Sequence, residues 1–265
     1  MSRLGPPLVA VLVASCGNET ARAPVPTAYD WPDSLAYRVD EVAQAPANSQ
    51  GPVRRESSRV LRFVMGYDGI YSIRQDSVRL GVAPRSGAPA AATPSSDTLR
   101  YFVRLSRWGE FLSLVPACDP AVPACGDAPR SEFVMRLRSI VPKLPVWWPP
   151  KGHPWEDTLD VNAWNRARGP AGTVVMRYRV ARDTVVGAVG YWVVAWTSLR
   201  PSSTGSPDSG VVYVDQRRMI PALAVWGGTR PPGPGDQGAA VTRVSGRAVL
   251  VGSGFDSLRV PEEAK

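Results

Sequence analysis

Alternation of apolar and basic side chains with a period of two residues is the feature of this sequence that most constrains its fold. Segments 98–105 (TLRYFVRL) and 173–180 (TVVMRYRV) both show it. The apolar positions that would share one face are Leu99, Tyr101, Val103 and Leu105 in the first segment and Val174, Met176, Tyr178 and Val180 in the second. Because successive side chains of a β-strand point to opposite faces, each segment predicts a strand with one buried face and one solvent face.

Segment 191–196 (YWVVAW) is apolar at every position, which predicts a central strand covered on both faces. A further strand is predicted at 35–39. The 265 residues include 24 glycines and 27 prolines, a content that suits strands joined by turns better than a helical bundle. The sequence therefore predicts a mainly β fold, with an α+β fold as the alternative.

One segment departs from the two-residue period. In SEFVMRLRSIVP the apolar residues recur at helical spacing, Ser131 can cap the start, and Pro142 ends the run. This predicts one short amphipathic helix near 131–141, laid on the sheet. Four polar segments rich in Pro and Gly are predicted as long exposed loops of a single β-rich domain at 29–265, namely 44–58, 84–97, 200–210 and 227–238.

The N-terminal segment has the layout of a secretory signal. Arg3 precedes an apolar run at 8–13, which is too short to cross a bilayer as a helix. The run ends in Val13-Ala14-Ser15-Cys16, which resembles the lipobox of bacterial lipoproteins. That resemblance implies a diacylglyceryl group on the sulfur of Cys16, a signal peptide at 1–15 and a lipidated, flexible tether at 16–28. The alternative is ordinary signal cleavage that leaves Cys16 as a free thiol.

A lipobox implies a cellular location as well as a membrane anchor. The protein would be held by lipid in the cell envelope, with the membrane as its first partner. Gly17 stands where an Asp favours retention in the inner membrane of well-studied Gram-negative bacteria. This predicts the outer membrane, with the protein facing the periplasm.

The other two cysteines, Cys118 and Cys125, lie in ACDPAVPACGD. An oxidising compartment permits a disulfide between them, and the pairing of these two leaves Cys16 for the lipid. A zinc site is the alternative, but their spacing is wide for zinc and the one histidine, His153, is distant. We predict the disulfide and no metal.

Charge and motifs argue against several classes of function. The net charge of +8 is compatible with anionic partners, or with the composition of a GC-rich genome, but no run of basic residues marks a nucleic-acid-binding arm. The sequence has no G-x-S-x-G and no P-loop. Glu156 and Asp157 would point to opposite faces of a strand, so they do not form a catalytic pair. We predict no enzyme activity, no cofactor and no nucleic-acid partner.

Tryptophan is concentrated in segment 144–164 (LPVWWPPKGHPWEDTLDVNAW), which holds four of the nine. Exposed indoles stack on lipids, sugars or proteins, so Trp147, Trp148 and Trp155 are candidate ligand-binding residues. The alternative is that these side chains close the mouth of the sheet as part of the core.

Segments 141–155 (VPKLPVWWPPKGHPW) and 178–196 (YRVARDTVVGAVGYWVVAW) resemble a group of uncharacterised bacterial envelope lipoproteins. The sheets of that group are similar to the curved antiparallel half-barrel of lipoprotein carriers. The resemblance implies an apolar concavity, and hence a binding protein for an apolar or lipid-like ligand whose pocket is lined by the strands of Tyr101, Tyr178 and Trp192. The alternative function is a structural or interaction lipoprotein that contacts an envelope protein or a glycan through the Trp-rich stretch.

Overall fold

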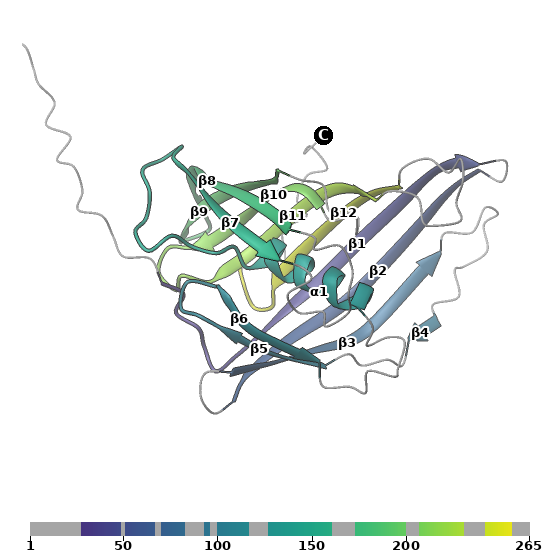
Figure 1. Ribbon diagram of the computed structural model, residues 1–265, viewed down its shortest axis with the longest axis horizontal. Helices are drawn as coiled ribbons and strands as arrows, with labels where there is room; N and C mark the ends of the chain where they lie inside the picture. The colour runs from purple at the N-terminus through teal and green to yellow at the C-terminus, as the bar shows by residue number, and fades with distance from the viewer. Residues whose placement is uncertain are drawn as a thin grey trace, which may run out of the picture.

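The computed structural model describes residues 28–48, 51–66, 70–82, 93–95, 100–116, 127–160, 173–199, 207–230 and 242–255. They form twelve strands in one antiparallel sheet and one helix (Figure 1). The strands are β1 (Ser34–Asn48), β2 (Gly51–Met65), β3 (Ile70–Val82), β4 (Thr93–Ser95), β5 (Arg100–Leu105), β6 (Phe111–Pro116), β7 (Pro154–Asp160), β8 (Thr173–Val186), β9 (Val189–Ser198), β10 (Pro207–Asp215), β11 (Pro221–Arg230) and β12 (Thr242–Leu250). The prediction of a mainly β, curved, open antiparallel sheet with one short helix is confirmed.

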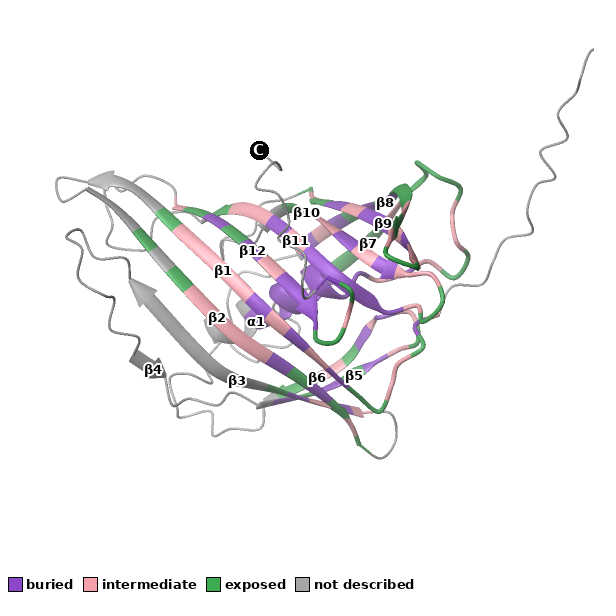
Figure 2. Cartoon of the chain, turned by 180° about the vertical axis from the view of Figure 1, so that it is seen from behind, coloured by how far each residue is buried: buried purple, intermediate pink, exposed green. Residues whose placement is uncertain are grey.

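The sheet wraps around the helix. Its strand order is β6-β5-β3-β2-β1-β12-β11-β10-β9-β8-β7, with β4 paired to β3, so β6 and β7 are its two ends. The helix α1 (Asp127–Ile140) connects these ends in the chain and lies inside the curve (Figures 1 and 2). Side chains of α1 meet β1, β5 and β7, and the helix also packs on β10 and β11. A single helix thus contacts strands from both halves of the sheet. Within the described residues, no helix has the length and apolar content needed to cross a bilayer.

The alternation predicted for the strands is confirmed. In β5, Tyr101, Val103 and Leu105 are buried, whereas Phe102 and Arg104 are exposed. The turn that follows, in which Gly109 has a φ of 80°, joins β5 to β6 as an antiparallel hairpin. The apolar positions predicted for β8 are likewise buried.

The strand β9 is covered on both faces, as its apolar sequence predicts. Trp196 belongs to the inner core around α1. Tyr191 belongs to a second, smaller cluster on the outer face, where Phe255 packs over it with ring centroids 4.9 Å apart. A strand with two buried faces needs apolar residues at every position, which explains YWVVAW.

The helix differs from its prediction in extent and in character. It begins at Asp127, so Ser131 lies inside it and does not cap it. Every residue from 133 to 140 is buried, including Arg136 and Arg138, so the described part of α1 has no solvent face and is not amphipathic. The reason is that the curved sheet surrounds the helix, and acidic residues of the strands supply partners for its arginines.

The prediction of a loop at 44–58 is wrong. Residues 44–48 complete β1 and residues 51–58 begin β2, and the two strands pair from Ser34 and Val64 to Asn48 and Gly51. Backbone pairing between two long strands outweighs the local preference of a polar, Pro-containing sequence. Of the other three predicted loops, 93–95, 207–210 and 227–230 belong to β4, β10 and β11, and the rest lies outside the described residues.

One register row of the inner face combines four aromatic rings with two glycines. It runs from β7 to β12 through Trp155, Tyr178, Trp196, Gly210, Trp226 and Gly246. A Cβ placed on Gly246 would stand within contact of the Trp226 indole, and one on Gly210 would meet the Trp196 indole. Each indole therefore lies across the glycine of the neighbouring strand, and both tryptophans belong to the inner core.

We expect Gly246→Ala to lower the free energy of unfolding by about 1 to 3 kcal/mol, because the new methyl group would displace the buried Trp226 ring. Urea unfolding followed by tryptophan fluorescence measures the loss. Gly227→Ala is the matched control, because it lies on the adjoining strand β11 and its Cβ would come no closer than 3.9 Å to another atom. Equal effects of the two substitutions would contradict the packing of Trp226 on Gly246.

Candidate functional site

The three residues predicted to line a pocket all belong to the inner side of the sheet, but the chain itself covers them. Tyr101 stacks on Phe133 of α1 with ring centroids 4.0 Å apart. Tyr178 stacks on Trp155 at 5.6 Å, and Trp192 lies 4.2 Å from Trp148. The predicted pocket at Tyr101, Tyr178 and Trp192 is therefore corrected, because Phe133 of α1, Trp155 of β7 and Trp148 cover these three side chains.

The three candidate tryptophans differ in exposure and packing. Trp148 and Trp155 are partly buried, lie 6.4 Å apart and pack against the core, and the Trp155 Nε1 donates a hydrogen bond to the Lys143 carbonyl at 2.7 Å. This is the arrangement expected of side chains that close the mouth of the sheet. Trp147 is 57% exposed and adjoins the exposed Val146. Their roles as a ligand or partner surface stay predictions. Trp164, Cys16, Cys118 and Cys125 lie outside the described residues.

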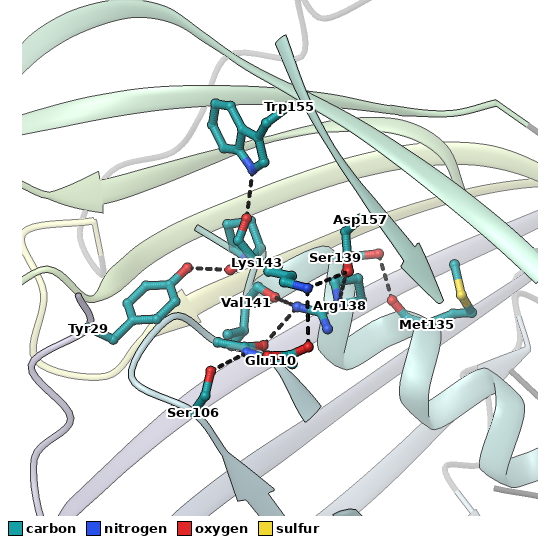
Figure 3. Close-up of polar contacts among 12 residues, drawn as sticks. Tyr29, Ser106, Glu110, Met135, Arg138, Ser139, Val141, Lys143, Trp155 and Asp157 are labelled. Atoms are coloured by element: carbon teal, nitrogen blue, oxygen red, sulfur yellow. Dashed lines mark hydrogen bonds and ion pairs between the residues drawn. The ribbon is translucent and has the colours of Figure 1, made fainter. Parts of the chain in front are cut away.

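A cluster of charged residues, which we call the edge cluster, joins the two ends of the sheet (Figure 3). It consists of Glu110, Arg138, Lys143 and Asp157. The Arg138 Nε lies 3.1 Å from the Asp157 Oδ2, and the Lys143 Nζ lies 3.2 Å from the Glu110 Oε1 and 3.6 Å from the Asp157 Oδ1. Asp157 belongs to β7 and Glu110 to the turn before β6, so these contacts hold the open edges together.

Arg138 also contacts β6 and the turn that precedes it. Its Nη1 donates hydrogen bonds to the carbonyls of Gly109 at 2.8 Å and Val141 at 3.3 Å, and its guanidinium lies 4.1 Å from the Phe111 ring centroid. The Nε and the Asp157 Oδ2 are close but are not aligned as a hydrogen bond, so that contact is ionic. The side chains of Glu156 and Asp157 face opposite ways, as predicted: Asp157 is buried, whereas Glu156 is exposed and pairs with Arg177.

A second group of charges, which we call the floor cluster, lies on the inner face farther along β1 and β2. The Glu41 Oε2 accepts hydrogen bonds from the Arg59 Nη2 at 2.6 Å and the Arg136 Nη2 at 2.9 Å, and its Oε1 accepts one from the Arg136 Nε at 3.0 Å. Glu41 continues the aromatic row beyond Gly246. The two clusters hold α1 by ion pairs on opposite sides, which accounts for the burial of its arginines.

A cavity of about 340 Å³, which we call the rim pocket, opens beside the start of β1. It is lined by Asp30, Pro32, Ser34, Leu35, Arg218, Ile220, Leu250, Val251 and Gly252. Leu35, Ile220 and Leu250 are buried members of the inner core. The apolar inner face therefore reaches solvent here, with the exposed side chains of Arg218 and Asp30 at the lip.

The turn that carries Arg218 is well ordered by local hydrogen bonds. The Asp215 Oδ1 accepts hydrogen bonds from the backbone N–H groups of Arg217 at 2.8 Å and Arg218 at 3.0 Å. Met219 follows with a φ of 49°, a conformation that is uncommon for a residue with a side chain and that places Ile220 toward the core. The rim pocket joins three distant segments of the chain, which explains why no sequence motif predicts it.

A second groove of about 400 Å³ lies at the far ends of β1, β10, β11 and β12. Register places Val42, Ser209, Gly227 and Ser245 side by side on the outer face there. The groove is lined mainly by small and polar residues, unlike the rim pocket with its three core side chains. The rim pocket is therefore the better candidate for an apolar ligand.

Comparison with known proteins gives only distant structural matches. No protein-family model and no curated protein matches the chain. A structure described as showing lipid–protein interactions in lipovitellin matches 84% of this chain with 9% identity and a TM-score of 0.43, and this chain spans 25% of its length. A LolA superfamily protein from Nitrosomonas europaea (11% identity, TM-score 0.19) and a DUF1329 family protein from Desulfovibrio piger (9% identity, TM-score 0.23) each match 84% of the chain, which covers 86% and 88% of them. At such low similarity, the function of this chain has to be argued from its own residues.

Proposed function

We propose that this chain is a lipid-anchored binding protein of the cell envelope, and that it takes up an apolar or lipid-like ligand at the rim pocket of its curved sheet. The lipobox-like residues 13–16 support anchoring through Cys16, and Gly17 supports the outer membrane with the protein facing the periplasm. The observation that carries the proposal is that core side chains of a concave sheet line a surface pocket beside a cation.

The chemistry of the rim pocket favours an amphiphile with an acidic group. Leu35, Ile220 and Leu250 offer apolar surface to a hydrocarbon chain, and burial of each methylene contributes about 0.8 kcal/mol. The Arg218 guanidinium at the lip would pair with a carboxylate or phosphate, while Asp30 on the same rim would repel it. The ligand would therefore enter tail first, with its acidic group held toward Arg218. Most ligand pockets have volumes of about 300 to 1,000 Å³, so this one accommodates part of a lipid.

We expect Val251→Trp to weaken the binding of a fluorescent fatty acid at least tenfold, because an indole at this exposed, pocket-lining position would occupy the cavity. The measurement is a fluorescence titration of delipidated full-length protein. Val185→Trp is the matched control, because Val185 is also exposed and does not line the pocket.

Arg218→Gln distinguishes the contribution of the ligand's acidic group to binding from that of its hydrocarbon tail. It should weaken fatty-acid binding a few-fold and leave binding of the corresponding fluorescent alcohol unchanged, since an exposed ion pair contributes about 0.2 to 1 kcal/mol. Failure of the wild-type chain to bind either probe, with no lipid in its native mass spectrum, would refute the ligand proposal. Incorporation of labelled palmitate into the wild type but not into Cys16→Ser tests the anchor separately.

A further inference from the structure

The outer face of β2, β3 and β5 carries a row of arginines. Arg62 of β2 pairs in register with Arg74 of β3, which pairs in register with Arg100 of β5. Arg62 and Arg74 are exposed, and Arg104 is exposed on the same face of β5. Register therefore places three arginine positions in one row of this face, and two of these side chains are exposed.

Apolar side chains occupy the adjacent row of the same face. Val64 of β2, Ser72 of β3, Phe102 of β5 and Val115 of β6 are in register. Val64, Phe102 and Val115 are 52%, 42% and 55% exposed. The solvent face of an antiparallel sheet ordinarily carries polar side chains, so three large apolar residues in one row next to arginines require an explanation.

We propose that this surface, which we call the outer patch (Arg62, Val64, Arg74, Phe102, Arg104 and Val115), docks on the anionic surface of a lipid bilayer. Arginine pairs with phosphate groups and can extend its charge to the headgroups while its stem lies in the apolar layer. Valine and phenylalanine gain free energy by burial at the headgroup boundary. A bilayer surface offers an anionic layer to the arginines and an apolar layer to the other side chains. Nucleic acid fits this patch less well, because two of its three apolar residues, Val64 and Val115, offer no stacking surface to bases.

The position of the outer patch relative to the start of the described chain supports this occupant. The backbone N–H of Tyr29 donates a hydrogen bond to the Arg107 carbonyl at 2.6 Å, and the Trp31 Nε1 donates one to the Ser106 carbonyl at 3.4 Å. The chain therefore enters the fold at the β5–β6 turn, beside the patch. At that turn the Arg107 guanidinium lies 4.4 Å from the Trp108 ring centroid, a pair of residue types suited to a membrane interface.

This positional argument rests on the proposed anchor at Cys16. Twelve residues after Cys16 reach Ala28, a distance of at most about 42 Å and on average about 20 Å for a flexible chain. An acyl group at Cys16 would therefore hold the β5–β6 turn within reach of the bilayer. Anchoring and patch would act together, and their combined affinity would exceed that of either one.

The test uses the full chain with Cys16→Ser, so that binding does not depend on acyl chains. We expect it to sediment with vesicles of phosphatidylcholine and phosphatidylglycerol, to bind vesicles of phosphatidylcholine alone much more weakly, and to be released by salt. Arg62→Gln with Arg74→Gln, and separately Phe102→Ser with Val115→Ser, should each weaken sedimentation on the order of tenfold or more. All four positions are outward-facing in the register, and thermal unfolding checks that each variant folds.

The matched control is Arg177→Gln with Arg179→Gln, which removes the same charge from exposed positions on β8. An equal loss of sedimentation in this control would show that binding depends on net charge alone, and would overturn the proposed docking surface. Absence of sedimentation with anionic vesicles would also overturn it. Retention on single-stranded DNA that the patch variants abolish would reassign the surface to nucleic acid. Fatty-acid titration of the same variants should be unchanged, so failure of the rim pocket and failure of the outer patch give different results.

Discussion

Asp157→Ala is expected to lower the free energy of unfolding by about 3 to 5 kcal/mol, as measured by urea unfolding near neutral pH. The side chains of Arg138 and Asp157 are 1% and 4% exposed. Removal of the carboxylate would leave the guanidinium inside the protein with carbonyl acceptors and an aromatic ring but without its buried counter-charge. The cost of burying a charge without its partner exceeds that of most single substitutions.

The neighbouring residue provides the control for this prediction. Glu156 lies on the same strand, is about half exposed and pairs with Arg177, so Glu156→Ala should change stability by less than about 1 kcal/mol. The double replacement Arg138→Met with Asp157→Leu should recover much of the loss, because it removes both buried charges together. Similar small losses for Asp157→Ala and Glu156→Ala would show that the edge cluster does not stabilise the closure of the sheet.

The strands of this protein could be predicted because their signal is local. In β5 and β8, apolar side chains alternate with arginines, so the type of each residue indicates which face of the sheet it occupies. The apolar positions are buried as this pattern predicts. The centre of α1 was predictable for the same reason. The start of α1 at Asp127 and the burial of its arginines could not be predicted. Arg136, for example, is buried against Glu41, which lies 95 positions earlier in the chain. Local sequence gives no sign of such a pair.

The error at 44–58 has the same origin. The sequence there is polar and contains Pro and Gly, which locally favour a loop, whereas the strand pairing of β1 with β2 is decided by two long backbones meeting in register. The rim pocket could not be predicted either, since Leu35, Arg218 and Leu250 come from three separate segments. The different surroundings of the adjacent residues Trp147 and Trp148 could not be predicted either. Trp147 is exposed, whereas Trp148 packs on the core.

Alkaline unfolding is the second large effect expected of this fold. Tyr29, Tyr37 and Tyr178 lie in the core, and burial is the main cause that raises the pKa of each hydroxyl above its ordinary value of 10.0. The hydroxyls of Tyr29 and Tyr37 donate hydrogen bonds to the carbonyls of Pro142 at 2.7 Å and Pro221 at 2.8 Å, contacts that only the protonated form can make. The folded state therefore keeps the protons of these hydroxyls at a pH above 10.0, where the unfolded chain releases them.

The sign of the pH dependence follows from this difference in bound protons. Above the ordinary pKa the unfolded state binds fewer protons, so stability is complete below about pH 10 and falls as the pH rises toward the folded-state values. Each tyrosine contributes a slope of about 1.4 kcal/mol per pH unit, and the three together about 4 kcal/mol per unit. Urea midpoints measured between about pH 8 and pH 11, with tyrosinate absorbance recorded in parallel, should show unfolding and ionisation in one transition. Tyr37→Phe should reduce the slope by about 1.4 kcal/mol per pH unit, the contribution of one tyrosine. A stability that stays constant across this range would mean that the tyrosines ionise within the folded protein, and hence that the inner face is open to water.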